Sequence, residues 1–250
     1  YIEIDGLIYV ITPYIEAREC EFDDDTDTVR ASTTLAHMHL AGKGFKPGEG
    51  IFIPSDLGKL PDNLKKRYDE IVRMRRKAER ERGAFDYMYL NCVDKFMEMA
   101  EKSLTLLDGV QHPRLIKKAL LEGCICHHDY SYQNILIKGA TTYITGFECC
   151  CEELRIYDLV NLMRRKMRKC EWDFQKAVML IDAYKKIAPL SADEIYVMEA
   201  MLLFPQKFWR VANRYYNSRR SWAQKNFTGM LEEVIEEYRV HVSFMNRYSE

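Results

Sequence analysis

The chain has 250 residues and a formal net charge of −1, with 37 Lys and Arg residues against 38 Asp and Glu residues. This balance gives no general attraction to nucleic acids or anionic membranes, and no apolar run approaches the length that spans a bilayer. Charged residues make up 30% and apolar residues 47%, which is typical of a folded chain with a hydrophobic core. The first residues show no secretory signal, so most of the eight cysteines are expected to be reduced, small, buried hydrophobes.

The first residues predict a β-hairpin. Tyr1–Ile4 and Leu7–Tyr14 are rich in Ile, Val and Tyr, and Asp5-Gly6 between them is a favoured two-residue turn. Two strands alone are marginal in water, so we expect more sheet to precede Tyr1 in the parent protein. We therefore divide the chain into residues 1–16, the last strands of an N-terminal β-lobe and its linker, and residues 17–250, a helical lobe.

The spacing of apolar residues predicts helices along most of the remaining chain. They cover about residues 27–40, 61–82, 85–107, 113–122, 157–169, 173–187, 192–204, 206–216 and 228–248. Short apolar or β-branched runs at 124–127, 135–137 and 141–145 predict strands. Ser191 and Glu194 have the spacing of a capping box at the start of one helix, and Pro205 should break the chain after Phe204.

The segment from His127 to Asn134 has the sequence His-His-Asp-Tyr-Ser-Tyr-Gln-Asn. Its spacing, His-x-Asp followed by four residues and Asn, is that of the catalytic loop of protein kinases. In such a loop the Asp accepts or orients the proton of an attacking hydroxyl, and the Asn reaches a magnesium ion beside the phosphates. We therefore predict Asp129 and His127 as catalytic residues and Asn134 as a metal ligand. The alternative is a loop in which His and Asp merely hold a turn.

A second metal-binding residue is expected one hairpin later, as the Asp of an Asp-Phe-Gly motif. At that distance the chain has Gly146-Phe147-Glu148, so glycine stands at the Asp position. Glycine has no oxygen ligand on its side chain, and magnesium would lack its main protein carboxylate. Glu148, two residues further on, is the candidate metal ligand that could reach back to replace it.

Three segments together resemble the superfamily of aminoglycoside phosphotransferases and choline kinases: residues 127–134, Gly146–Glu148 and Tyr157-Asp158-Leu159. More closely, the chain resembles the CotS family of bacterial spore coat proteins, also through residues 14–16, 164–169, 204–209 and 213–222. The resemblance implies an α+β, protein kinase-like (aminoglycoside phosphotransferase-like) fold, mainly its helical C-terminal lobe with a remnant β-hairpin of the N-terminal lobe. It also implies that Asp158 braces the catalytic loop by accepting backbone hydrogen bonds.

Two functions follow from this resemblance. The first, which Gly146 favours, is a degenerate phosphotransferase that acts in coat assembly. It would be made in the cytoplasm of the mother cell, deposited on the spore coat, and have other spore coat proteins as partners. The second, which the pair Asp129 and Asn134 favours, is an ATP-dependent phosphotransferase acting on a small-molecule substrate, with ATP and magnesium as cofactors. No Gly-rich loop or lysine-bearing strand precedes Tyr1, so the chain by itself is expected to be inactive.

Other patterns have a functional and a structural interpretation. A zinc site is conceivable at Cys124, Cys126, His127, His128 and Cys149–Cys151, but a buried strand rich in cysteine is favoured. The basic run at residues 164–169 could bind phosphate, but a solvated helix face is favoured. A cluster near a helix end suits a ligand or partner site, with a core-lining helix end as the alternative: Tyr215, Arg219, Arg220 and Trp222.

Overall fold

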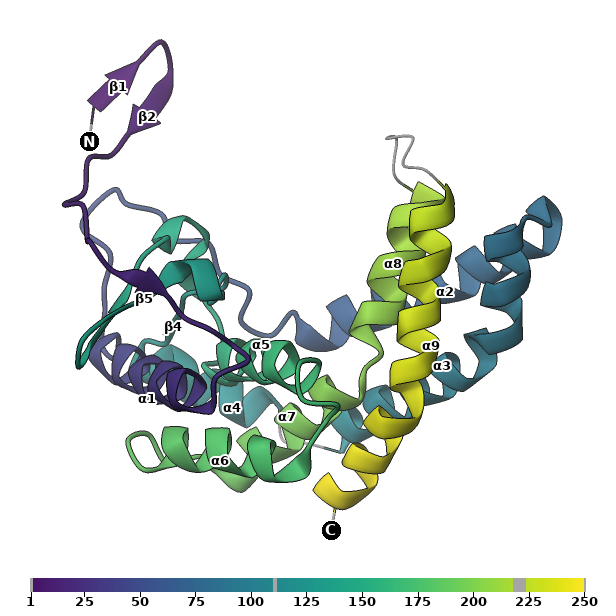
Figure 1. Cartoon of the computed structure of the whole chain (residues 1–250). Coiled ribbons are helices and arrows are strands. Elements are labelled where there is room, and N and C mark those ends of the chain that lie inside the picture. The colour runs from purple at the N-terminus through teal and green to yellow at the C-terminus, as the bar shows by residue number, and fades with distance from the viewer. Residues whose placement is uncertain (1, 110–111, 218–223, 250) are drawn as a thin grey trace.

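The computed structural model describes residues 2–109, 112–217 and 224–249. This part of the chain is mainly helical, with small antiparallel sheets on one side (Figure 1). The predicted α+β class is therefore confirmed. None of the described helices is both long and apolar enough to cross a membrane.

The N-terminal hairpin forms where the sequence predicts it. Strands β1 (Ile2–Ile4) and β2 (Leu7–Tyr9) pair antiparallel around the Asp5-Gly6 turn. The second strand is shorter than the predicted Leu7–Tyr14 segment. The hairpin projects from the rest of the molecule (Figure 1), and Ile4 and Leu7 are exposed.

Two further sheets frame the predicted catalytic loop. Strand β3 (Arg18–Glu19) pairs with β5 (Ile135–Lys138), which pairs with β6 (Thr141–Ile144). Strand β4 (Ile125–Cys126) pairs with β7 (Cys151–Glu152). The loop of residues 127–134 therefore leaves one sheet and enters the other, and the β6–β7 connection lies beside it.

The helices are arranged in two groups (Figure 1). The described residues form two hydrophobic cores, and helices of the second group also contribute residues to the core of the first. The first group, beside the sheets, contains α1 (Asp25–Ala41), α4 (His112–Glu122), α5 (Ile156–Met167), α6 (Phe174–Lys185) and α7 (Ala192–Leu203). The second contains α2 (Leu60–Glu81), α3 (Ala84–Asp108), α8 (Gln206–Asn217) and α9 (Gln224–Tyr248). All the predicted helices are present, with ends shifted by a few residues.

Stacked aromatic rings dominate the core of the second group. The ring of Phe208 on α8 lies 4.1 Å from that of Phe96 and 5.2 Å from that of Tyr89, both on α3. All three side chains are buried. Pro205 separates α7 from α8, as predicted, so that α8 turns away from the first group to join the second.

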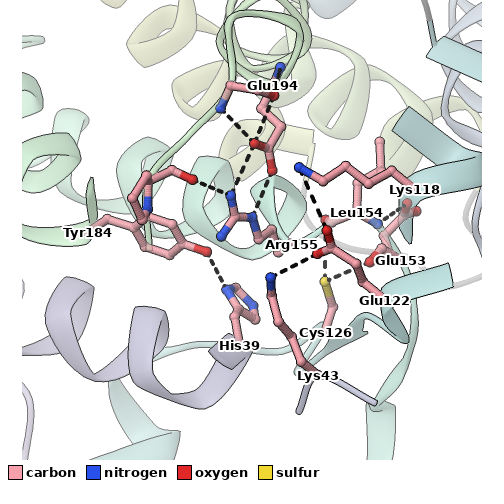
Figure 2. Close-up of polar contacts among 12 residues, drawn as sticks. His39, Lys43, Lys118, Glu122, Cys126, Glu153, Leu154, Arg155, Tyr184 and Glu194 are labelled. Atoms are coloured by element: carbon pink, nitrogen blue, oxygen red, sulfur yellow. Dashed lines mark hydrogen bonds and ion pairs between the residues drawn. The ribbon is translucent and has the colours of Figure 1, made fainter. Parts of the chain in front are cut away.

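The predicted capping box is present at the start of α7. Ser191 Oγ accepts from the backbone N–H of Glu194, and Glu194 Oε2 accepts from the backbone N–H of Ser191. The same carboxylate also pairs with Arg155, which lies immediately before α5 (Figure 2). One glutamate therefore connects the first turns of two helices.

Candidate functional site

The backbone of the predicted catalytic loop is held by Asp158, in the first turn of α5. Its buried carboxylate accepts from the backbone N–H of His127 at 2.7 Å and from that of His128 at 2.9 Å. The ring of His39 on α1 lies 3.2 Å from the same carboxylate, and its other nitrogen is 2.7 Å from the hydroxyl of Tyr184 (Figure 2). Burial acts to raise the pKa of Asp158, but His39 and the two N–H groups together hold that pKa below its ordinary value.

The ring of His127 is fully buried beneath the loop. Its Nε2 lies 2.8 Å from the carbonyl oxygen of Thr145, and its Nδ1 lies 3.3 Å from the backbone nitrogen of Asp129. A neutral ring that donates from Nε2 and accepts at Nδ1 satisfies both contacts. The ring therefore connects the predicted catalytic loop to the end of β6.

Asp129 and Asn134 lie next to each other on the open side of the loop. The side chain of Asp129 is 51% exposed. Asn134 Nδ2 donates to the backbone oxygen of Asp129 at 2.9 Å and to its Oδ2 at 3.2 Å. Arg165 Nη2, on α5, lies 3.6 Å from Asp129 Oδ1. The predicted catalytic carboxylate thus faces a guanidinium group and the nitrogen side of the predicted metal ligand.

Gly146 closes the other side of Asn134. Its φ of 77° lies in the left-handed region, and a Cβ added there would lie 2.5 Å from Asn134 Oδ1 and 2.7 Å from Cγ. Such distances are far inside van der Waals contact. The amide of Asn134 therefore occupies the space that the Cβ atom of a metal-binding residue at position 146 would need.

The donor set does not fit a kinase-type magnesium site. Glu148 is exposed, in the short 3-10 helix Phe147–Cys149, and in the described part of the chain no hydrogen bond or ion pair joins it to Asp129 or Asn134. Magnesium is usually held by one or two carboxylates in near-octahedral geometry. Among the residues that the structure describes, Asp129 is the one carboxylate in contact with Asn134, and the oxygen of Asn134 is turned toward Gly146.

Among the described residues, only three of the seven candidate zinc ligands lie in a cluster of potential ligands, and these three fall in two separate clusters. Cys126 lies with His39 and Asp158, whereas His128 and Cys151 lie with Asp56, the potential ligand atoms of each group being within 4.8 Å of one another. Each group offers three donors, whereas a structural zinc site uses four. Of the eight cysteines, the buried ones are Cys20, Cys92, Cys126 and Cys151, while Cys149 is exposed. The interpretation as small buried hydrophobes therefore suits half of them.

The solvated-face interpretation of the basic run at residues 164–169 is wrong. Lys166 is almost completely buried and its Nζ lies 2.8 Å from Asp25 Oδ1. Arg164 donates to the backbone oxygen of Met201 on α7. Only Lys169 of this run is exposed. The reason is that α5 packs against α1, α6 and α7, which leaves little of its circumference for solvent.

Sequence patterns missed two residues of the site. His39 supports Asp158 from a helix far away in sequence, and nothing in its surroundings along the chain indicates this. The sequence showed Arg165 only as one member of a basic run and gave no sign of its contact with Asp129. The predicted cluster near residue 215 is only partly described: the ring of Tyr215 stacks on that of Phe85 at 3.9 Å, whereas Arg219, Arg220 and Trp222 lie outside the described residues.

The fold is that of the aminoglycoside phosphotransferases. The chain is similar to the crystal structure of an aminoglycoside phosphotransferase from Alicyclobacillus acidocaldarius subsp. acidocaldarius DSM 446, with a TM-score of 0.82 and 21% sequence identity. The similarity covers 94% of this chain and 69% of the other. At this identity the comparison shows the fold alone, and it confirms the predicted kinase-like architecture.

The family comes from a second comparison. The family described as "Spore coat putative kinase YutH" matches residues 7–248. The chain belongs to this family of kinase-like spore coat proteins. The predicted relation to kinase-like spore coat proteins is thereby confirmed.

Proposed function

We propose that this chain is a spore coat component whose kinase-like fold serves as a binding and assembly module, without magnesium-dependent phosphoryl transfer. In this proposal it is made in the cytoplasm of the mother cell, deposited on the spore coat, and held there by other coat proteins. Membership of the YutH family supports the coat location. The contact between Gly146 and Asn134 supports the loss of transfer chemistry.

That contact is the observation that carries the proposal. Phosphoryl transfer depends on metal ions that neutralise the developing charge on the phosphates. Here the position of the second metal ligand has no side chain, and the amide of Asn134 fills the space beside it. The neighbouring Glu148 is exposed and has no described contact with Asp129.

The retained motif also has a structural use. Asp158 binds the backbone of residues 127 and 128, and the ring of His127 binds Thr145 and Asp129. Tyr130, within the same motif, is buried and donates to the backbone oxygen of Ala31 on α1. We propose that His127 and Asp158 are positioning residues that join two sheets and two helices, a use that requires no catalysis.

An ATP-dependent phosphotransferase acting on a small hydroxyl or amino compound is the second candidate. It is favoured by the exposed carboxylate of Asp129, which lies 3.2 Å from the side chain of Asn134. In that candidate Asp129 is the base, and Asn134 and Glu148 would be the magnesium ligands. Binding of ATP would have to turn the oxygen of Asn134 away from Gly146.

Calorimetric titration of ATP with magnesium into the full-length protein separates the two candidates. The proposal expects no magnesium-dependent heat and no ADP formation. Tight binding that requires magnesium and weakens in Asn134→Ala, with turnover lost in Asp129→Asn, would overturn it. Gln133→Ala is the matched control, because Gln133 is an exposed neighbour on the same loop.

The coat assignment is tested separately in sporulating cells. A fluorescent fusion of the full-length protein is expected to accumulate at the forespore surface and to remain with purified spores. The Asp129→Asn and Asn134→Ala variants should localise as the wild type does, because neither substitution removes a buried group. A fusion that stays dispersed in the mother cell would contradict the coat assignment.

A further inference from the structure

A cavity of about 140 Å³ lies where the two helix groups meet. Its walls come from the C-terminal end of α5, the corner between α7 and α8, and α9. Five cationic side chains line it: Arg164, Arg165, Arg168, Lys207 and Arg210. Aromatic side chains supply an apolar surface, among them Phe96, Trp172 and Phe208. We call this space the arginine cavity.

The acidic residue lining the arginine cavity is already engaged. Glu237 Oε1 accepts from the indole nitrogen of Trp172 at 2.7 Å, and Oε2 lies 2.9 Å from Lys207 Nζ. Glu237 therefore offsets the charge of Lys207 and part of the charge of Arg168, and the charges of the other three arginines remain.

The arginines find few acidic partners elsewhere. Arg164 donates to the backbone oxygen of Met201, and Arg168 Nε donates to that of Arg164 at 3.0 Å. A carbonyl oxygen satisfies a hydrogen bond but carries no net charge. Arg210 has no hydrogen bond or ion pair within the part of the chain that the structure describes, and Arg165 has only Asp129, at 3.6 Å.

Like charges are therefore crowded around one cavity. Burial, and after it the neighbouring arginines, hold the pKa of Arg164 down to about 9. Arg210 is exposed at the rim, but partial desolvation of its guanidinium group still lowers its pKa, and the charges of Arg168, Arg214 and Arg165 lower it further. An oxyanion in the cavity would turn this repulsion into attraction, and guanidinium groups suit phosphate and carboxylate geometry.

We infer that the arginine cavity binds an anionic small molecule, which places a phosphate or carboxylate among Arg164, Arg168 and Arg210 and its carbon skeleton against the aromatic wall. Arg165 both lines the cavity and lies beside Asp129. The ligand would thus sit next to the predicted catalytic loop. This inference rests on the proposed role of the chain as a binding module, and it adds the class of ligand that the module binds.

The test uses three probes of similar size with the full-length protein, in buffer of low ionic strength without ATP or magnesium. Phenyl phosphate and benzoate carry the two anionic groups, and benzylamine carries the opposite charge. We expect one or both anions to raise the melting temperature and to give calorimetric heat that falls with added salt. Benzylamine should give neither. Binding of one anion but not the other identifies the group, whereas binding of neither anion overturns the inference.

Variants then assign the binding to this cavity. Arg168→Gln and Arg210→Gln should each weaken anion binding about tenfold or more, because each removes charge-assisted hydrogen bonds. Arg73→Gln, an equal charge change on an exposed position of α2, should leave it unchanged. Anion binding that is equal in both cavity variants and in the wild type would overturn the inference.

The melting temperatures of the unliganded variants distinguish an anion site from a purely structural arginine. Removing one of several crowded charges should raise the melting temperature of Arg168→Gln in low salt, and addition of salt should shrink the difference. If Arg168→Gln does not fold, Arg210→Gln, which is exposed at the rim, carries the same comparison. Because no nucleotide is present, failure of this test is distinct from failure of the ATP titration.

Discussion

Asn134 uses the nitrogen of its amide to hold Asp129 and places the oxygen against Gly146. The φ of 77° at Gly146 would not by itself exclude aspartate, because Asp tolerates the left-handed region better than most residues. The contact with Asn134 is therefore a steric obstacle to a carboxylate, in addition to the conformational cost of a side chain at this φ.

Gly146→Asp is expected to lower the free energy of unfolding by about 1–2 kcal/mol more than the strain of a positive φ alone, because Asn134 must move and lose its hydrogen bonds to Asp129. Gly139→Asp is the matched control, since Gly139 also has positive φ, 56°, but its added Cβ would meet no atom within 4 Å. That variant should lose only the cost of the positive φ, on the order of 1 kcal/mol. Urea denaturation measures both, and equal losses would contradict the steric explanation.

At this scale the sequence could predict proximity but not orientation. The spacing of the motif predicts that Asp129 and Asn134 meet, and they do. It cannot predict which side of the amide faces the carboxylate, because this depends on Gly146, which approaches through the fold. For the same reason the burial of Lys166 could not be predicted, since basic residues in a helix are exposed unless other helices cover them.

An ion pair between Arg155 and Glu194 joins two of the helices around the site. Arg155 Nε lies 2.7 Å from Glu194 Oε1, and Arg155 Nη2 lies 3.1 Å from Oε2 (Figure 2). Both side chains are nearly buried, at 13% and 10% exposure. Burial acts to raise the pKa of Glu194, but Arg155 and the N–H of Ser191 hold that pKa below its ordinary value. The pair thus fixes α7 against α5, which carries Asp158.

Glu194→Gln is expected to lower the free energy of unfolding at neutral pH by about 2–4 kcal/mol, because Arg155 would remain buried without its partner. Glu98→Gln removes the partner of Lys102 in a pair of which both members are exposed, and should cost no more than about 0.5 kcal/mol. Chemical denaturation compares the two variants. Similar small losses would mean that Arg155 finds another acceptor.

Helices were predictable as elements because apolar spacing persists over several turns. The strands β3 and β7 were not, since two residues contain no period and their pairing partners lie far away in sequence. The capping box of α7 was predictable because it is local, whereas the second partner of Glu194 was not. Interactions between residues close in sequence could therefore be predicted, whereas contacts between separate elements could not.

The whole molecule contains acidic groups with opposite pH dependence. Burial, and after it Asp56 and Asp158, raise the pKa of Glu153 to about 7, even though the N–H of Leu154 opposes the shift. Between its unfolded pKa near 4.5 and about 7, the folded state binds more protons than the unfolded state, so this group makes stability fall as pH rises. Asp158 and Glu194, whose pKa values are lowered, contribute stability that is lost as pH falls.

Glu153→Gln should therefore have little effect near pH 5 and raise the free energy of unfolding by up to about 2–3 kcal/mol at pH 8. The glutamine oxygen can still accept from the backbone N–H of Leu154, so the local hydrogen bond is kept. Urea unfolding of wild type and variant at both pH values measures the difference. A gain that is the same at pH 5 and pH 8 would show that ionisation of Glu153 is not its source.

The contact between Gly146 and Asn134 affects which substitutions this site can accept during evolution. A lineage that carries this pair is expected to lose some stability when one substitution restores the second carboxylate, because the new side chain meets the amide of Asn134. Asn134 would have to shift in the same step, and its bonds to Asp129 oppose that shift. The conformation of Asn134 therefore favours retention of glycine at position 146, and glycine in turn allows that conformation.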